Sequence, residues 1–161
     1  MSSDSPRLTA NEFRQAAGRF ATGITVATVM DAEGMPHGLT ANSFTSVSLE
    51  PPLVLVCVGH AAATLESFRT AKYFGVNILA EDQRTLSERF ARKGHNRFEG
   101  IDWHPGKTGV PLLPGVVAAL ECEVHRKIAA GDHDVFLGEV VRVEVHEKTP
   151  LVYFAGRYHR L

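Results

Sequence analysis

Short apolar runs and alternations dominate the chain, and they predict many strands and few helices. Turn residues such as those at 31–34 and 131–133 separate neighbouring runs and predict hairpins. No regular alternation of strands with long helices is present. The pattern therefore predicts a mainly β fold, an antiparallel β-barrel with a few short flanking helices. The strands are expected over residues 24–30, 35–41, 53–58, 73–79, 116–126, 134–146 and 151–154.

Three short helices are predicted from polar residues that precede apolar faces. Thr9 and Glu12 have the spacing of a capping box, and Thr85 and Glu88 repeat it before the third helix. Thr64 is expected to cap the helix between them. The first helix carries an apolar face made of Phe13, Ala16, Ala17 and Phe20.

The stretch 38–58 organises the rest of the chain. A strand leads into the hydroxyl-rich run 42–46, and the six apolar residues 53–58 follow a double proline. Such an unbroken apolar run predicts a strand buried on both faces. The polar run offers N–H, hydroxyl and amide groups to a flat, heteroatom-rich ligand. A simple turn whose hydroxyls bind their own backbone explains it as well, and the residues alone favour that reading.

Length and composition predict one domain of ordinary globular character. Residues 1–8 are expected to be a flexible tail and residues 9–161 a single domain, with 44% apolar residues and a net charge of −1. A net charge so close to zero gives no indication of nucleic-acid binding. No apolar stretch approaches the length of about 20 residues that a membrane span requires. Cys57 and Cys122 lie in apolar runs, which favours two reduced thiols and a cytoplasmic location.

Familiar catalytic and metal motifs are absent from the sequence. Its eight histidines are scattered without metal-ligand spacing, and it has no nucleophile elbow, phosphate-binding loop or dinucleotide-binding glycine motif. The long segment 94–115, which contains Phe98, Ile101 and Trp103, is expected to be functional or to contact a partner. Its Trp103 suggests a contact between subunits.

Several segments then reveal a resemblance that covers nearly the whole chain. Residues 38–54, GLTANSFTSVSLEPPLV, resemble the signature of the short-chain flavin reductases, the reductase components of two-component flavin-dependent monooxygenases. Other matching segments follow in the family's order: FATGITV at 20–26, FGVNIL at 74–79, FEGIDW at 98–103, GDH at 131–133 with FLGEV at 136–140, and PLVYFAGRY at 150–158.

The resemblance implies an FMN-binding split β-barrel, usually a homodimer with flavin near the subunit interface. It also implies an NAD(P)H:flavin oxidoreductase that transfers hydride to FMN or FAD and supplies reduced flavin to a partner monooxygenase. A flavin carrier or sensor without turnover is the alternative, and a split-barrel oxidase with its own substrate ranks third. The choices between FMN and FAD, and between NADH and NADPH, remain open.

The same resemblance assigns site residues. The implied flavin-binding residues are Pro36, His37, Gly38, Leu39, Thr40, Asn42, Ser43, Cys57, Val58, Gly59, Ala63, Thr64, Arg89 and Phe90. Thr64 and Arg89 would hold phosphate, whereas Ala63 departs from the longer or polar residue expected there. The implied nicotinamide side consists of His133, in a positioning role, with Tyr153, Phe154, Ala155 and Gly156.

Overall fold

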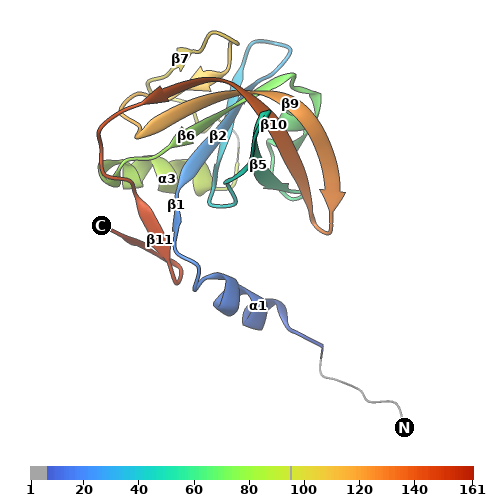
Figure 1. Ribbon diagram of the computed structural model, residues 1–161, viewed down its shortest axis with the longest axis vertical. Helices are drawn as coiled ribbons and strands as arrows, with labels where there is room; N and C mark the ends of the chain where they lie inside the picture. The colour runs from blue at the N-terminus through green and yellow to red at the C-terminus, as the bar shows by residue number, and fades with distance from the viewer. Residues whose placement is uncertain (1–6, 95) are drawn as a thin grey trace.

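The computed structural model describes residues 7–94 and 96–161, and an antiparallel sheet of seven strands forms its body (Figure 1). The strand order is β3-β2-β6-β9-β10-β5-β4. Over the described ranges no pairing joins the edge strands β3 and β4, so the barrel is open along that side. The predicted mainly β, split-barrel fold is confirmed. Its strands are β2 (Thr25–Met30), β3 (Pro36–Ala41), β4 (Thr45–Leu49), β5 (Pro52–Gly59), β6 (Tyr73–Ile78), β9 (Ala118–Ala130) and β10 (His133–Val145).

Smaller elements surround this sheet. A second sheet contains β1 (Thr22–Gly23), β11 (Val152–Phe154) and β12 (Arg157–His159), and a short hairpin pairs β7 (His104–Pro105) with β8 (Pro111–Leu112). The helices are α1 (Ala10–Ala17), α2 (Leu65–Thr70), the 3-10 helix η1 (Glu81–Gln83) and α3 (Arg84–Ala91). Among the described residues, no helix has the length and apolar character needed to cross a membrane.

The two predicted capping boxes have different outcomes. Thr9 caps α1 as expected: its N–H donates to Glu12 Oε2 at 2.8 Å, and the N–H of Glu12 donates to its Oγ1 at 3.2 Å. The prediction for Thr85 is wrong, because α3 follows η1 directly and Thr85 lies inside the helix. Gln83 occupies the cap position, and its Oε1 accepts the N–H of Ala80 at 3.0 Å.

The region around β4 and β5 corrects two predictions. Residues 45–49 form a strand with mostly exposed side chains, so the polar turn is confined to residues 42–44. Along β5, fully buried positions alternate with half-buried or exposed ones, so this strand is not buried on both faces. β5 pairs with β10 and β4 within a curved sheet that has one face toward the core and the other outward. Successive side chains of β5 therefore alternate between these two faces.

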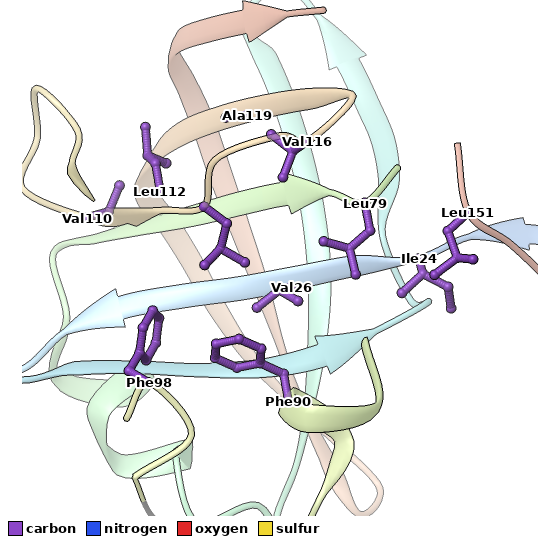
Figure 2. Packing of buried hydrophobic residues seen from close by; sticks show 11 residues of the cluster. Ile24, Val26, Leu79, Phe90, Phe98, Val110, Leu112, Val116, Ala119 and Leu151 are labelled. Carbon is purple, nitrogen blue, oxygen red and sulfur yellow. The ribbon is translucent and has the colours of Figure 1, made fainter. Parts of the chain in front are cut away.

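Two hydrophobic clusters form the core. In the first, Phe90 from α3 and Phe98 from the segment after it meet edge to face at a centroid distance of 4.9 Å, close to Val26 of β2 (Figure 2). The buried amide of Asn77 joins β6 to its surroundings: it donates to Val26 O at 3.1 Å and accepts the N–H of Leu113 at 2.8 Å. This cluster therefore fixes α3 and the segment 98–116 against the sheet.

Glu121 of β9 is a second buried polar group. The residue is 4% exposed. The carboxylate accepts the N–H of Lys107 at 3.1 Å and both the N–H and the hydroxyl of Thr108, at 2.7 and 2.6 Å. Burial opposes ionisation, but these donors and Arg142 outweigh it and hold the pKa of Glu121 below its usual value. Glu121 thereby pins the turn between β7 and β8.

Helix α1 stands away from the barrel in Figure 1, near the small sheet that contains β11. Its predicted apolar face is largely uncovered by the part of the chain that the structure describes. Phe13 is 61% exposed, and Phe20, just beyond the helix, is 79% exposed. The helix therefore owes its stability to its cap and local contacts rather than to burial within this chain.

Candidate functional site

Two adjacent cavities lie along β3. The larger has a volume of about 560 Å³ and is walled by the start of β3, Thr64, residues 96–99 and Trp103. The smaller, of about 360 Å³, is walled by Leu39 and Thr40, the loop 61–63 and the end of α3. Both share Gly94 and Arg97, so the second continues from the first. The structure thus brings together many of the residues predicted to bind flavin: Pro36, His37, Gly38 and Thr64 at the larger cavity, and Leu39, Thr40, Ala63 and Phe90 at the smaller one.

The turn before β3 sets the position of its first residues. Oδ1 of Asp31 accepts the N–H groups of Glu33 and Met35, at 3.0 and 2.7 Å, which closes the turn. Oδ2 of the same carboxylate lies 2.7 Å from His37 Nε2. The hydrogen bond from His37, followed by that from Met35, lowers the pKa of Asp31 below its ordinary value. The imidazole of His37 is thereby held at the wall of the larger cavity.

Helix α3 holds the middle of β3 through two contacts. The hydroxyl of Thr40 donates to Ser87 O at 2.6 Å. Gly38 lies close to the ring of Phe90. A Cβ added to Gly38 would lie 3.0 Å from Phe90 Cε1 and 3.2 Å from Ala27 O. Glycine at this position lets β3 approach the aromatic ring. The boundary between the two cavities is therefore a tightly packed wall.

The hydroxyl of Thr64 is a buried polar group at the wall of the larger cavity. Thr64 is 5% exposed, and within the described ranges its buried Oγ1 has no hydrogen-bond partner. It occupies the cap position of the six-residue helix α2 but makes no capping hydrogen bond, so the predicted cap is only positional. A buried hydroxyl without a partner costs about 1–3 kcal/mol, and a ligand oxygen in the cavity would relieve that cost.

Arg97 is a second polar side chain of this kind, and the sequence reasoning missed it. Its Nη1 donates to Gly38 O at 2.8 Å. Its Nε is buried and lacks a partner in the part of the chain that the structure describes. Burial lowers the pKa of the guanidinium, which nevertheless stays charged because an arginine pKa lies so far above neutrality. The signal available in the sequence was an arginine directly before Phe98 in a segment too long to be a simple loop.

Arg89, predicted to hold phosphate, contacts the segment that carries Arg97. Its guanidinium donates to the carbonyl oxygens of Arg97, Asn96 and Glu99, at 3.1, 3.3 and 2.9 Å. It also borders a third cavity of about 300 Å³, together with the exposed Arg92 and Lys93. The geometry makes Arg89 a support for residues 96–99, and its direct contact with a phosphate stays a prediction.

Besides Arg89, five predicted flavin-binding residues lie outside the linings of the two cavities, after the end of β3 and along β5: Asn42, Ser43, Cys57, Val58 and Gly59. Ser43 and Cys57 are linked, because the N–H of Cys57 donates to Ser43 Oγ at 3.0 Å. Asn42 is exposed, and the side chain of Val58 points into the core. The N–H of Cys57 is therefore already used in the free protein, and the predicted contacts of these residues with the flavin ring remain predictions.

His133 begins β10 and lies over Gly59, the last residue of β5. A Cβ at Gly59 would lie 3.4 Å from His133 Nε2. The other ring nitrogen, Nδ1, is 2.6 Å from Asp132 Oδ1, and this contact lowers the pKa of the aspartate. The imidazole side chain remains 48% exposed. The imidazole thus lies at one end of the β5–β10 strand pair. Its Nδ1 contacts Asp132, and its Nε2 is on the side of Gly59.

The buried carboxylate of Asp134 supports the start of β10. Asp134 is 6% exposed, and its two oxygens accept Arg69 Nε at 2.7 Å and His60 Nε2 at 2.8 Å. The hydrogen bond from Arg69, and then that from His60, lowers the pKa of Asp134. Because Asp134 directly follows His133, this network fixes the backbone on which the imidazole is carried.

The other predicted nicotinamide residues, 153–156, lie elsewhere in this chain. Tyr153 pairs with Thr22 in the small sheet and packs edge to face against Tyr158 at a centroid distance of 5.4 Å. Ala155, with a φ of 51°, donates its N–H to Gly18 O at 2.8 Å. In Figure 1, β11 lies at the lower left of the barrel and the tip of the β9–β10 hairpin at its lower right, well apart from each other. A single chain therefore does not bring Tyr153–Gly156 to His133.

Comparison with known proteins finds relatives that match most of this chain. The model of the flavin reductase-like domain matches residues 17–161. A protein of Agrobacterium fabrum named FMN reductase (NADH) SmoA is 42% identical over 148 residues, which cover 92% of this chain and 84% of that protein. A Rhizobium meliloti protein named "Probable flavin reductase" is 46% identical over 145 residues, and this chain spans 47% of its length.

A solved structure extends the likeness to three dimensions. The NADH:FAD oxidoreductase SgcE6 of Streptomyces globisporus, in complex with NAD and FAD fragments, superposes with a TM-score of 0.89 at 38% identity. The match covers 98% of this chain and 97% of that one. The domain match spans most of the chain, and the relatives exceed 40% identity over nearly all of it. The chain therefore belongs to the flavin reductase-like family.

Proposed function

We propose that this protein is an NAD(P)H-dependent flavin reductase that transfers hydride from a reduced nicotinamide to FMN or FAD and supplies reduced flavin to a separate monooxygenase. One observation carries the proposal: Thr64 Oγ1 and Arg97 Nε are buried without partners among the described residues, and both side chains line the cavities along β3. A phosphorylated ligand would satisfy both groups. The names of the relatives, which include NADH-dependent FMN and FAD reductases, support flavin as that ligand.

The residues fit flavin chemistry, in which a bound flavin accepts hydride at N5 from nicotinamide C4. No side chain has to act as a nucleophile, so binding and orientation are the tasks of the protein. Thr64 and Arg97 would fix the phosphate, and the wall formed by Gly38 and Phe90 would limit where the flavin lies. His133, held by Asp132, would orient the nicotinamide beside Gly59.

The first experiment measures NADH consumption by the purified protein in the near-ultraviolet absorbance band of the nicotinamide. FMN, FAD and riboflavin are added in turn, and NADPH replaces NADH in a parallel series. We expect turnover that depends on added flavin. Absence of turnover with every flavin and both nicotinamides would reject the reductase and leave a flavin carrier or sensor on the same barrel.

His133→Ala separates these two functions further. A reductase should lose nicotinamide use, seen as a higher KM for NADH, more than it loses flavin affinity. A carrier should show no change, because His133 lies at Gly59 and not in the lining of either cavity. Folding should be preserved, since the imidazole is 48% exposed and its hydrogen bond is to the neighbouring Asp132.

Self-association is a further part of this proposal. The largely exposed Leu8, Phe13 and Phe20 leave an apolar surface around α1 that a second copy could cover. The segment 94–115, with Trp103, is expected to contribute to the same homodimer. Mass measurement at micromolar concentration tests this, and a monomer alone would contradict it. A cytoplasmic location is proposed from the two free thiols, Cys57 and Cys122.

A further inference from the structure

His60 contacts the chain on both sides of His133. It directly follows Gly59, the last residue of β5, which lies opposite His133 in the pairing of β5 with β10. The N–H of His60 donates to Asp132 O at 2.8 Å, one residue before His133. The ring atom Nε2 of His60 lies 2.8 Å from Asp134 Oδ1, one residue after it. His60 therefore holds both neighbours of His133, one through its backbone and the other through its side chain.

The orientation of the His133 ring depends on these neighbours. A Cβ added to Gly59 would lie 3.4, 3.7 and 3.8 Å from Nε2, Cδ2 and Cε1 of the ring, so the ring faces the side of Gly59 on which a side chain would stand. The remaining nitrogen, Nδ1, lies 2.6 Å from Asp132 Oδ1. Both contacts require residues 132–134 to stay in place against residues 59 and 60, and the two hydrogen bonds of His60 hold them there.

Asp134 transmits the effect of the His60 side chain. Its buried carboxylate needs donors, because an unpaired buried charge is costly, and the second donor is Arg69 Nε at 2.7 Å. Arg69 is itself held on α2, since its Nη1 donates to Glu66 Oε1 at 2.7 Å. Resting on the proposed function, in which His133 orients the nicotinamide, we propose that His60 is a positioning residue of the reductase. It acts through Asp132 and Asp134 on the imidazole of His133 and not by contact with either nucleotide.

A double-mutant cycle separates this role from two alternatives, a contribution to stability alone and a direct contact between His60 and the nicotinamide nucleotide. Residues that act through one another have non-additive effects, so removal of the His133 ring should abolish the effect of His60. Under either alternative, the loss of the His60 side chain would lower activity by the same factor with and without the His133 ring.

Steady-state kinetics with NADH at saturating flavin compare wild type, His60→Ala, His133→Ala and the double variant. We expect His60→Ala to lower kcat/KM for NADH about tenfold, because a misplacement of about 1 Å can cost about 100-fold. In the His133→Ala background the same change should cost less than about twofold. The flavin Kd should also change by less than about twofold, since His60 lies outside the linings of both cavities. Equal losses in the two backgrounds, or an equal loss of flavin affinity, would overturn the inference.

His60→Gln is the conservative variant, because its side-chain amide can donate to Asp134 from about the position of the histidine Nε2. It should keep most of the wild-type kcat/KM, and a loss as large as in His60→Ala would overturn the inference. The control is His125→Ala, at an exposed position of β9, and it should match wild type. His60→Ala should fold, since the side chain is 41% exposed. If it does not, Arg69→Met removes the other donor to Asp134 and should show the same dependence on His133.

NMR spectra of the histidine rings in the ligand-free protein give a readout that does not depend on turnover. The ring signals of His133, assigned by their loss in His133→Ala, should shift in His60→Ala. They should shift much less in His60→Gln, which also lacks the imidazole but keeps the hydrogen bond. Equal shifts in the two variants, or none in either, would overturn the inference. Turnover that does not depend on His60 would defeat this inference alone, whereas no turnover with any flavin would defeat the proposed reductase.

Discussion

Replacing Arg97 with methionine removes a guanidinium from both cavities while it keeps a long unbranched side chain. Two effects on the ligand-free protein oppose each other. Loss of the bond to Gly38 O, 2.8 Å long, costs about 0.5–1.5 kcal/mol, whereas removal of the buried Nε that lacks a partner in the described ranges relieves about 1–3 kcal/mol. We therefore expect the free energy of unfolding to stay near the wild-type value or to rise by up to about 2 kcal/mol.

Flavin binding, in contrast, should become weaker in Arg97→Met. A hydrogen bond between a guanidinium and a phosphate contributes about 1.5–3 kcal/mol, which corresponds to an increase of about 10- to 100-fold in the Kd for FMN. Riboflavin carries no phosphate, so its Kd in Arg97→Met should change by less than about threefold. Flavin fluorescence titration gives both Kd values, and urea unfolding gives the stability of the same samples.

Arg126→Met is the matched control, because Arg126 is exposed on β9, lies outside both linings and changes the net charge equally. It should leave both flavin affinities unchanged. If Arg97→Met weakens FMN and riboflavin alike, Arg97 shapes the cavity instead of binding phosphate. A loss of more than about 2 kcal/mol in the free energy of unfolding would refute the argument from the unpartnered Nε.

Three other substitutions test neighbouring parts of the argument. Thr64→Val should raise the midpoint of thermal unfolding, because it removes a hydroxyl without a partner in the described part of the chain, and should raise the Kd for FMN; a lower midpoint would contradict this. Gly38→Ala should lower the free energy of unfolding by about 1–3 kcal/mol in urea titrations, since its Cβ would crowd Phe90, and an unchanged midpoint would count against that packing. Glu121→Gln should destabilise the protein by about 1–3 kcal/mol at pH 7. Because the folded pKa of Glu121 is lowered, its stabilisation is complete above the unfolded pKa of about 4.3 and is lost as the pH falls through the folded value, so a deficit independent of pH would contradict the assignment.

Local periodicity predicted most of the strands and hairpins, because alternation and turn residues act within a few positions of each other. It failed where partners are distant in sequence. Glu121 is buried because the turn containing Lys107 and Thr108 folds over it, and no local pattern records that contact. Residues 45–49 form β4 because β5 offers a free edge, which overrides the preference of a hydroxyl-rich run for a turn.

The sequence predicted part of the candidate site, as it did part of the fold. Residues 36–40 and Thr64 gather at the cavities because β3 and the loop after β5 follow motifs that are continuous in sequence. Arg97 was missed because its role depends on the packing of Phe98 against Phe90, which turns the segment 96–99 toward β3. The dimer and the contacts of residues 153–156 with nicotinamide stay predictions, since a single chain does not test them.

The unpaired polar atoms connect stability to function. In the described ranges, three buried side-chain atoms lack a hydrogen-bond partner: Thr64 Oγ1, Arg97 Nε and Thr22 Oγ1. The first two belong to residues that line the cavities, and Thr22 pairs with Tyr153 at the start of the segment predicted for nicotinamide. Each such group destabilises the free protein, and a ligand that satisfies it binds more tightly and stabilises the fold by the same linkage. Of the three, only Thr64 was predicted from the sequence to bind flavin; Arg97 lines the same cavity, and Thr22 pairs with a residue predicted for nicotinamide. The unpaired groups therefore lie at or beside the predicted sites, which is the pattern expected when a fold gives up stability to prepare a site.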